Sequence, residues 1–174
     1  MIITRTPVRI SFVGGGTDMP SFYDDEGGAV LSTTINKYFY TVLTERPDSR
    51  VQLISSDLRI LEAVDAIDAS KDAGDLRIPL AVLRRYSIGQ GLNLFMASEI
   101  PPGTGLGSSA AVCVNVIRAI WALQGRPVNP YELAEESFDI ASRTLGEPVG
   151  KQDEYAAAFG GLNEIVFERE SVTV

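Results

Sequence analysis

A run of small and polar residues from Pro101 to Ala111 could bind an anion. It reads Pro-Pro-Gly-Thr-Gly-Leu-Gly-Ser-Ser-Ala-Ala, with glycine at positions 103, 105 and 107. Alternating glycines let the backbone turn tightly and present its N–H groups outward. We expect Ser108 and Ser109 to cap the following helix, so that the positive end of its dipole faces the same point. The run therefore predicts a phosphate-binding loop.

Other interpretations of this run are weaker. A Gly-x-Gly-x-Gly pattern alone is also typical of an ordinary turn before a buried helix. The run lacks the lysine of a Walker loop, and it does not match the dinucleotide-binding fingerprint at the end of a strand.

Two further segments place ionisable residues beside glycines. Gly14-Gly15-Gly16-Thr17-Asp18 follows a strand-like stretch that contains Arg9, and Lys151 and Asp153 follow Gly150. Consecutive glycines predict a loop that something approaches closely. The plainer alternatives are an Asp18 side chain that bonds its own backbone, and surface charges at a helix end for Lys151 and Asp153.

Composition excludes several kinds of chemistry. The chain has no histidine, so it cannot use a Ser-His triad or histidine metal ligands, and its single cysteine, Cys113, rules out an internal disulfide. Cys113 falls in an apolar stretch, where we expect a small buried hydrophobic residue. A net charge of −8 argues against broad nucleic-acid or anionic-membrane binding. No apolar run is long enough to span a membrane and the start does not resemble a signal peptide, so we expect a cytoplasmic protein.

Hydrophobic periodicity indicates the elements that position these groups. The expected strands cover residues 2–6 and 8–13, interrupted at Pro7, and 28–44, 51–55, 92–100 and 162–168. The expected helices cover residues 78–86, with Arg84 and Arg85 on a solvated face, and a buried stretch after the phosphate loop to about 123. A further helix, capped by Asn129, runs to about 145, and a short one lies between Gly150 and Gly161. The order predicts one α+β domain, a mixed and mostly antiparallel sheet packed against helices.

The chain resembles the GHMP kinase superfamily, which includes galactokinases, homoserine kinases and mevalonate kinases. The run from 101 to 111 resembles its phosphate loop, and Arg9 with Gly14 to Asp18 resembles its first motif. Gly-Lys-Gln-Asp-x-Tyr-Ala-Ala-x-Phe-Gly-Gly-x-Asn at 150–163 is similar to D-glycero-D-manno-heptose 7-phosphate kinases. The resemblance covers about Thr6 to Phe167. It implies the fold of a GHMP amino-terminal, ATP-binding domain over residues 1–174, similar to domain 2 of a small-subunit ribosomal protein, with the carboxy-terminal domain absent from this chain.

The resemblance also implies a role for each site residue. Asp153 would be the catalytic carboxylate, and Arg9 would neutralise charge beside it. Asp18 would hold sugar hydroxyls, and Lys151 could pair with the 7-phosphate or keep Asp153 ionised. Substrate would further contact Gly15, Gly16 and Thr17. ATP phosphates would lie on Pro102, Gly103, Thr104, Gly105, Leu106, Gly107, Ser108 and Ser109, with Ser108 near Mg²⁺.

Two departures from the family pattern affect this expectation. Ala141 occupies the position of a glutamate that helps to hold Mg²⁺ in galactokinases, so either Asp139 or Glu136 replaces it or the phosphates and Ser108 hold the ion. The second departure is the missing carboxy-terminal domain, which would leave an apolar face for self-association or for a separate carboxy-terminal half.

The expected activity is ATP-dependent transfer of phosphate to the anomeric hydroxyl of D-glycero-D-manno-heptose 7-phosphate. Two alternatives stay open. One is a kinase of the same family for another metabolite, such as L-fucose, galactose or mevalonate. The other is a non-catalytic nucleotide-binding relative or half-enzyme.

Overall fold

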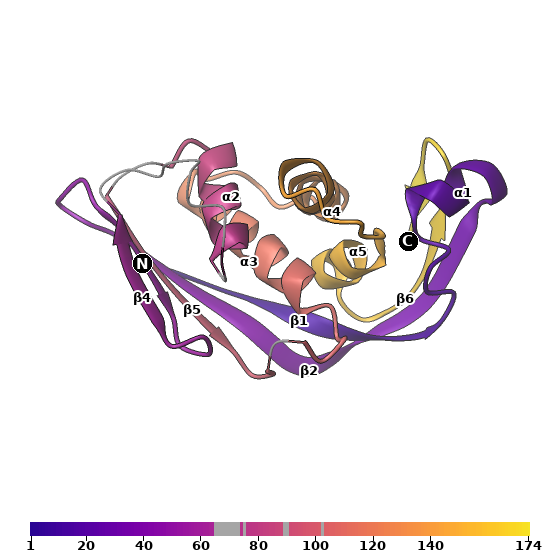
Figure 1. Ribbon diagram of the computed structural model, residues 1–174, viewed down its shortest axis with the longest axis horizontal. Coiled ribbons are helices and arrows are strands. Elements are labelled where there is room, and N and C mark those ends of the chain that lie inside the picture. The colour runs from indigo at the N-terminus through magenta and orange to yellow at the C-terminus, as the bar shows by residue number, and fades with distance from the viewer. Residues whose placement is uncertain (65–73, 75, 89–90, 102) are drawn as a thin grey trace.

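The structure, a computed structural model, describes residues 1–64, 74, 76–88, 91–101 and 103–174. A curved sheet forms one layer, and most of the helices pack against a single face of it (Figure 1). The strands run in the order β4-β3-β5-β2-β6-β7, and β1 pairs with β2. Their bounds are Ile2–Val13 (β1), Gly28–Glu45 (β2), Val51–Ser55 (β3), Ile60–Val64 (β4), Leu92–Ser98 (β5), Leu162–Phe167 (β6) and Val172–Thr173 (β7). All pairs are antiparallel except β3 with β5, which confirms the predicted α+β class.

The long strand β2 organises the sheet. It pairs with β1 along most of its length, with β6 over its first part and with β5 over its last part. Its alternating buried residues, Val30, Ser32, Phe39, Thr41 and Leu43, face the helical layer. The period-2 pattern of the sequence therefore identified this strand correctly.

The expected break at Pro7 is wrong, because β1 continues through it. Pro7 is paired with Tyr38 and Arg9 with Thr34, so the pairing shifts between them and β2 carries the extra residues. The irregularity absorbs the missing proline N–H without ending the strand. It lies directly before Arg9, a predicted site residue.

The helices are α1 (Pro20–Glu26), α2 (Arg77–Arg85), α3 (Ser108–Leu123), α4 (Pro130–Asp139), the π-helical turn η2 (Ile140–Thr144) and α5 (Gln152–Phe159). α3 contacts β1, β2, α2, α4 and α5, and its residues from Ala110 to Trp121 are buried except for Val112 and Arg118. This central position confirms the expected buried helix and holds the preceding loop in place. Among the described residues, no helix has the length and apolar character needed to cross a membrane.

The helix predicted from Asn129 to about residue 145 changes form near its end. Asn129 caps α4 as expected, since its Oδ1 accepts hydrogen bonds from the N–H groups of Tyr131 and Glu132. From Ile140 the chain continues as a π-helical turn to Thr144. Such turns are rare in proteins, and those that occur often lie at functional sites. The sequence analysis did not predict this turn, and α1, β4 and β7 were also missed.

Candidate active site

The phosphate-loop candidate has the expected glycine geometry. Gly103, Gly105 and Gly107 have φ values of +78°, +72° and +74°, a left-handed conformation that side chains with a Cβ rarely adopt. Alternation of this conformation with ordinary residues turns successive N–H groups toward one side, as in anion-binding nests. Pro102, also predicted to contact phosphate, lies outside the described residues.

The predicted serine caps are wrong. Gly107 occupies the N-cap position of α3, and no side chain caps this helix end. Ser108 and Ser109 are consequently the first residues inside the helix, where their hydroxyls do not occupy the capping position. The Ser108 Oγ is buried and has no hydrogen-bond partner among the described residues. The start of α3 thus retains free N–H groups and a hydroxyl for a ligand.

Arg9 connects the loop with the predicted catalytic carboxylate. Its Nε donates to Asp153 Oδ1 at 2.7 Å, and a second guanidinium nitrogen lies 2.5 Å from the same oxygen. Its third nitrogen donates to the carbonyl of Gly105 at 2.8 Å, and its backbone N–H donates to the carbonyl of Leu106 at 3.0 Å. A single residue of β1 therefore fixes the loop and Asp153 relative to each other.

Asp153 stands in the first turn of α5, directly beside the start of α3. A Cβ added to Gly107 would lie 3.2 Å from Asp153 Oδ2, which shows how closely the loop approaches this carboxylate. Burial raises the pKa of Asp153 above its ordinary value, and the Arg9 guanidinium opposes this rise. The carboxyl side chain keeps 29% of its surface exposed, so a ligand can reach it.

Asp18 holds the first glycine loop against α5. It is 2% exposed, and its carboxylate accepts hydrogen bonds from the N–H of Gly16 and from the backbone and side-chain amides of Gln152, at 2.9 to 3.1 Å. The backbone N–H of Lys151 also donates to the carbonyl oxygen of Asp18. Asp18 therefore positions the residues next to Asp153.

The other residues of the first motif differ in their surroundings. The Thr17 hydroxyl donates to the Gly14 carbonyl at 2.8 Å and accepts from the N–H of Ala29, so it ties the loop to β2. No atom lies within 4 Å of a Cβ added to Gly16, and a Cβ added to Gly15 would make only ordinary van der Waals contacts. Gly16 therefore borders open space, whereas the Thr17 side chain serves the turn.

The structure does not bring the Lys151 ammonium to Asp153. Lys151 Nζ lies 2.7 and 3.0 Å from the two carboxylate oxygens of Glu135, and Tyr155 Oη donates to the same carboxylate at 2.5 Å. The lysine also faces the rings of Phe138 and Tyr23. The cation paired with Asp153 is therefore Arg9 and not Lys151.

Two cavities meet at the start of α3. The inner cavity, about 130 Å³, is lined by Arg9, Asp18, Cys113, Ala141, Asp153 and Glu154, among others. The outer cavity, about 230 Å³, is mostly apolar and is lined by Phe39, Leu58, Leu76, Met96, Ile100 and Ser108, among others. Both include Ser109 and Ile78. A ligand held by the loop could therefore extend into either one.

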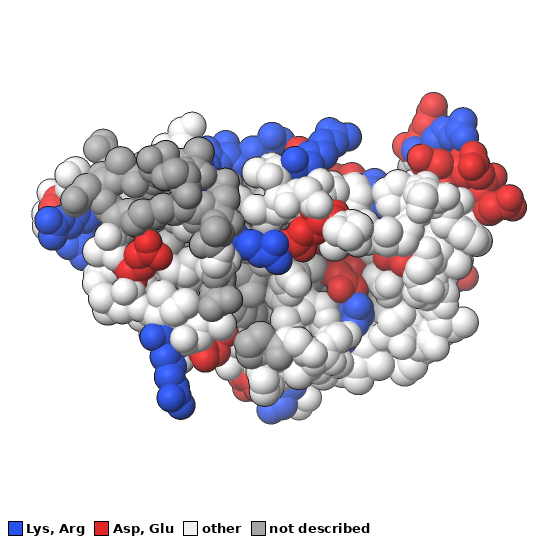
Figure 2. Space-filling model, in the orientation of Figure 1, with Lys and Arg blue, Asp and Glu red and all other residues white. Residues whose placement is uncertain are grey.

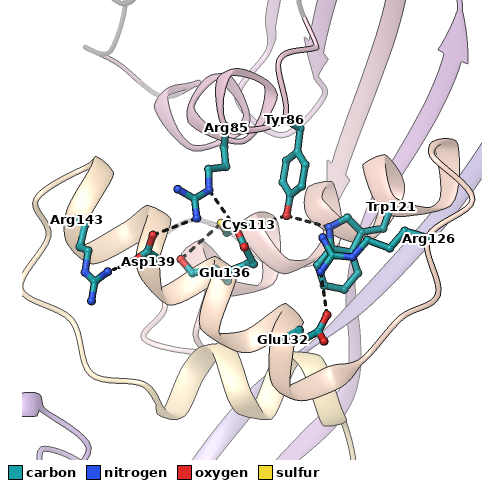
Figure 3. A network of polar contacts seen from close by, with 10 residues as sticks. Arg85, Tyr86, Cys113, Trp121, Arg126, Glu132, Glu136, Asp139 and Arg143 are labelled. Atoms are coloured by element: carbon teal, nitrogen blue, oxygen red, sulfur yellow. Dashed lines mark hydrogen bonds and ion pairs between the residues drawn. The ribbon is translucent and has the colours of Figure 1, made fainter.

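Neither Glu136 nor Asp139 replaces the glutamate missing at Ala141. Figure 3 shows both carboxylates turned toward Arg85 of α2, at 3.3 and 3.4 Å, and Asp139 also pairs with Arg143. Neither lines the inner cavity, which Ala141 borders directly. Arg85 is exposed, as expected, and its ion pairs also join α2 to α4.

Two acids that the sequence analysis did not single out line the inner cavity. Glu147 forms an ion pair with Arg77, at 2.7 Å, whereas Glu154 is 3% exposed and its Oε2 has no hydrogen-bond partner among the described residues. Burial raises the pKa of Glu154 to about 8, with a contribution from Asp153. In the sequence, the only indication that Glu154 belongs to the site is its position directly after Asp153. The structure confirms Cys113 as a buried residue, with its thiol pKa raised to about 12 by burial.

A metal ion would depend on few protein ligands here. In the described part of the chain, no group of three or more histidine, cysteine, aspartate or glutamate side chains could hold an ion. The unpaired Ser108 hydroxyl offers an oxygen of the kind that Mg²⁺ prefers. Ligand phosphates would have to complete the coordination.

Comparisons of the sequence and the structure with known proteins agree on one family. Residues 76–161 match the family model "GHMP kinases N terminal domain". The D-glycero-alpha-D-manno-heptose 7-phosphate kinase of Campylobacter jejuni is 33% identical over 171 residues, which are 95% of this chain and 50% of that protein. A galactokinase from Roseiflexus is 30% identical over 164 residues, 91% of this chain and 40% of the relative.

A solved structure extends the similarity to the fold. The crystal structure of a D-glycero-D-manno-heptose 1-phosphate kinase from Bacteroides thetaiotaomicron matches with a TM-score of 0.91 and 30% identity, covering 100% of this chain and 59% of the other. The chain spans about half the length, or less, of these curated relatives.

Proposed function

The chain belongs to the GHMP kinases, of which it carries the N-terminal domain, and we propose that it is the ATP-binding part of a sugar-phosphate kinase. In this proposal residues 1–174 form that domain, and a carboxy-terminal domain, covalently attached or separate, completes the site. The proposed reaction transfers the γ-phosphate of ATP to the anomeric hydroxyl of D-glycero-D-manno-heptose 7-phosphate.

The observation that carries the proposal is the contact of Arg9 with both Asp153 and the Gly105 carbonyl. It joins an acceptor-activating carboxylate to a phosphate-binding loop at the N-terminus of a buried helix. Phosphoryl transfer depends mainly on positioning and on fixed donors, which such a rigid arrangement can supply.

The nucleotide would lie across the start of α3. The loop N–H groups from Gly103 to Ser109 would bind its phosphates, and the mostly apolar outer cavity would receive its base and sugar. Because both cavities include Ser109, the γ-phosphate would point toward Asp153 in the inner cavity.

Asp153 would then orient the sugar hydroxyl and accept its proton. The hydroxyl oxygen forms a new bond to the γ-phosphorus while the bond to the β,γ-bridging oxygen breaks and ADP leaves. Arg9 favours the anionic form of the carboxylate and would place positive charge beside the transferred group. Asp18 would keep Asp153 in position through Gln152, and could in addition accept a bond from a sugar hydroxyl.

GHMP kinases use ATP and typically Mg²⁺, and the residues at the start of α3 fit such an ion. The buried, unpaired Ser108 hydroxyl would be one ligand beside the nucleotide phosphates. When bound, the ion would neutralise phosphate charge.

The names of two relatives support a heptose phosphate as the substrate, although one is named for the 7-phosphate and the other for the 1-phosphate. Gly16 would leave room for the sugar beside the first glycine loop. Lys151 would contact the substrate phosphate only by leaving Glu135. The galactokinase among the relatives keeps galactose as a second candidate substrate, with L-fucose as a third.

A non-catalytic nucleotide-binding relative is the alternative from another functional class. The observation that favours it is Ala141, which leaves the inner cavity without the carboxylate that galactokinases carry at this position. Retained ATP binding without phosphate transfer would support it.

The deciding experiment uses the chain together with a carboxy-terminal GHMP domain and measures ATP-dependent phosphorylation of a panel containing D-glycero-D-manno-heptose 7-phosphate, galactose and L-fucose, with Asp153→Asn as the matched control. We expect product from the heptose phosphate with the unaltered protein and a loss of at least about 100-fold in the variant. ATP binding without product from any sugar would contradict the kinase proposal and favour the alternative. Product from another sugar would change the assigned substrate.

A further inference from the structure

Glu154 is a buried acid for which the proposed reaction has no use. It follows Asp153 in the first turn of α5, is 3% exposed and lines the inner cavity. Its Oε2 atom makes no hydrogen bond, and it forms no ion pair with lysine or arginine among the described residues. An ionised carboxylate in such a place is strongly disfavoured unless a cation or a donor joins it.

The backbone N–H of Glu154 donates to its own carboxylate, but among the described residues no cation pairs with it. The charged groups that line the same cavity are Arg9, Asp18, Glu147 and Asp153. Arg9 is engaged by Asp153, and the remaining three are acids. The cavity therefore has an excess of acidic oxygens, of which Glu154 Oε2 has no partner among the described residues, and it opens toward the helix end where we propose that phosphates bind.

The small side chain of Ala141 leaves space in the inner cavity on the side formed by η2. The η2 turn carries Ala141, and the last acids before it, Glu136 and Asp139, point to Arg85 instead (Figure 3). The position that a glutamate occupies in galactokinases thus contributes only a methyl group. Glu154 reaches the same cavity from α5.

We propose that Glu154 is a protein ligand of the divalent cation that accompanies the nucleotide, and that it supplies from α5 the carboxylate that Ala141 lacks. The inference rests on the proposed function, because the nucleotide phosphates must provide most of the other ligands. Mg²⁺ is commonly held in this way, by one or two carboxylates together with substrate phosphates and water. The lack of a preassembled cluster of three metal-binding side chains in the described residues agrees with such a shared site.

Calorimetric titration with the non-hydrolysable analogue AMPPNP, with and without Mg²⁺, tests the proposal without relying on turnover. We expect Mg²⁺ to tighten AMPPNP binding by the unaltered protein, and Glu154→Gln to reduce this enhancement on the order of tenfold. Glutamine has nearly the same shape and carries no charge, so binding without Mg²⁺ should be unchanged. Glu136→Gln removes an acid that lies off the cavity and should leave the Mg²⁺ effect unchanged.

A double variant guards against a merely structural effect. Adding Ala141→Glu to Glu154→Gln returns a carboxylate to the same cavity, so it should restore the Mg²⁺ enhancement. An unchanged enhancement in Glu154→Gln would overturn the inference while leaving the proposed function intact. Failure of the unaltered protein to bind AMPPNP under either condition would overturn both, which keeps the two outcomes distinguishable.

Discussion

At the scale of single residues, Arg9 has the most consequences for the proposed chemistry. Its guanidinium contacts Asp153 and the carbonyl of Gly105, and its backbone holds Leu106. Since Asp153 must be ionised to accept a proton, activity should fall as the pH drops through the pKa of this carboxyl. Burial raises that pKa and Arg9 lowers it.

Arg9→Gln should therefore reduce kcat by about 100-fold and move the acidic limb of the pH profile to higher pH. The sign follows from the loss of the cation, which leaves burial unopposed and so raises the pKa of Asp153 further. Measurement of kcat/KM from pH 5 to 9 checks this. Arg5→Gln is the control, because Arg5 stacks on Tyr38 and lines neither cavity. An acidic limb at the same pH in Arg9→Gln would contradict the assignment.

Gly150 is the other residue whose identity the site requires. A Cβ at this position would lie 2.0 Å from Asp18 Oδ2, inside the contact that holds the first loop against α5. Gly150→Ala should destabilise the fold by about 2 kcal/mol or more and lower the melting temperature by several degrees. Gly15→Ala is the matched control, since its Cβ would meet nothing closer than 3.6 Å. Equal melting temperatures of the two variants would be inconsistent with this close packing.

The sequence identified some site residues better than others. Arg9, Asp18, Asp153 and the loop glycines were predicted because their motifs place them in fixed order, and the structure brings them together. The suggested contact of Lys151 with Asp153 is absent, because the partner of Lys151, Glu135, lies 16 residues away on another helix, and no local pattern predicts that pair. The serine caps were predicted from residue type, whereas a left-handed Gly107 takes the capping position instead.

At the scale of elements, α3 connects the site to the sheet through a buried polar contact. The Asn115 side chain donates to Thr41 Oγ1 at 2.9 Å and to the Phe39 carbonyl at 3.2 Å, and it accepts from Thr6 Oγ1 at 3.1 Å. These bonds join the helix to β1 and β2 inside the core. They fix where α3 sits on the sheet, and hence where its N-terminus lies.

Asn115→Ala should therefore cost about 2–3 kcal/mol of unfolding free energy, because it leaves several buried polar groups without partners. Asn129→Ala removes a cap at a surface helix end and should cost about 1 kcal/mol. Urea denaturation of both variants provides the comparison. A smaller loss for Asn115→Ala than for Asn129→Ala would argue against a structural role for this contact.

Element prediction succeeded where a local period extends over many residues. The alternation of β2 and the apolar character of α3 were sufficient to find both elements. The π-helical turn after Asp139 was not predictable, because residues 140–144 have helical composition and the turn depends on tertiary contacts. The strand β4 was missed in a charged stretch, where pairing with β3 determines its structure.

At the scale of the whole molecule, the helical layer covers only one face of the sheet. Charged side chains are spread over the view in Figure 2, with acids gathered at the end that carries α1. On the uncovered sheet face, pairing places five exposed apolar side chains on neighbouring strands, Ile10, Phe12, Leu31, Leu162 and Val166. We call these five residues the outer patch.

The outer patch surrounds Glu164, which is paired with Leu31, and it should drive self-association of this chain because exposed apolar side chains gain free energy by leaving water. Sedimentation velocity over a hundredfold range of concentration should show association that weakens in the double variant Phe12→Ser, Leu162→Ser. Val128→Ser changes an exposed apolar residue between α3 and α4 and should have no effect. Neither changed residue of the patch lines a cavity, so nucleotide binding should persist in the double variant. If the unaltered chain sediments as a monomer at every concentration, the outer patch is not an association surface for this chain.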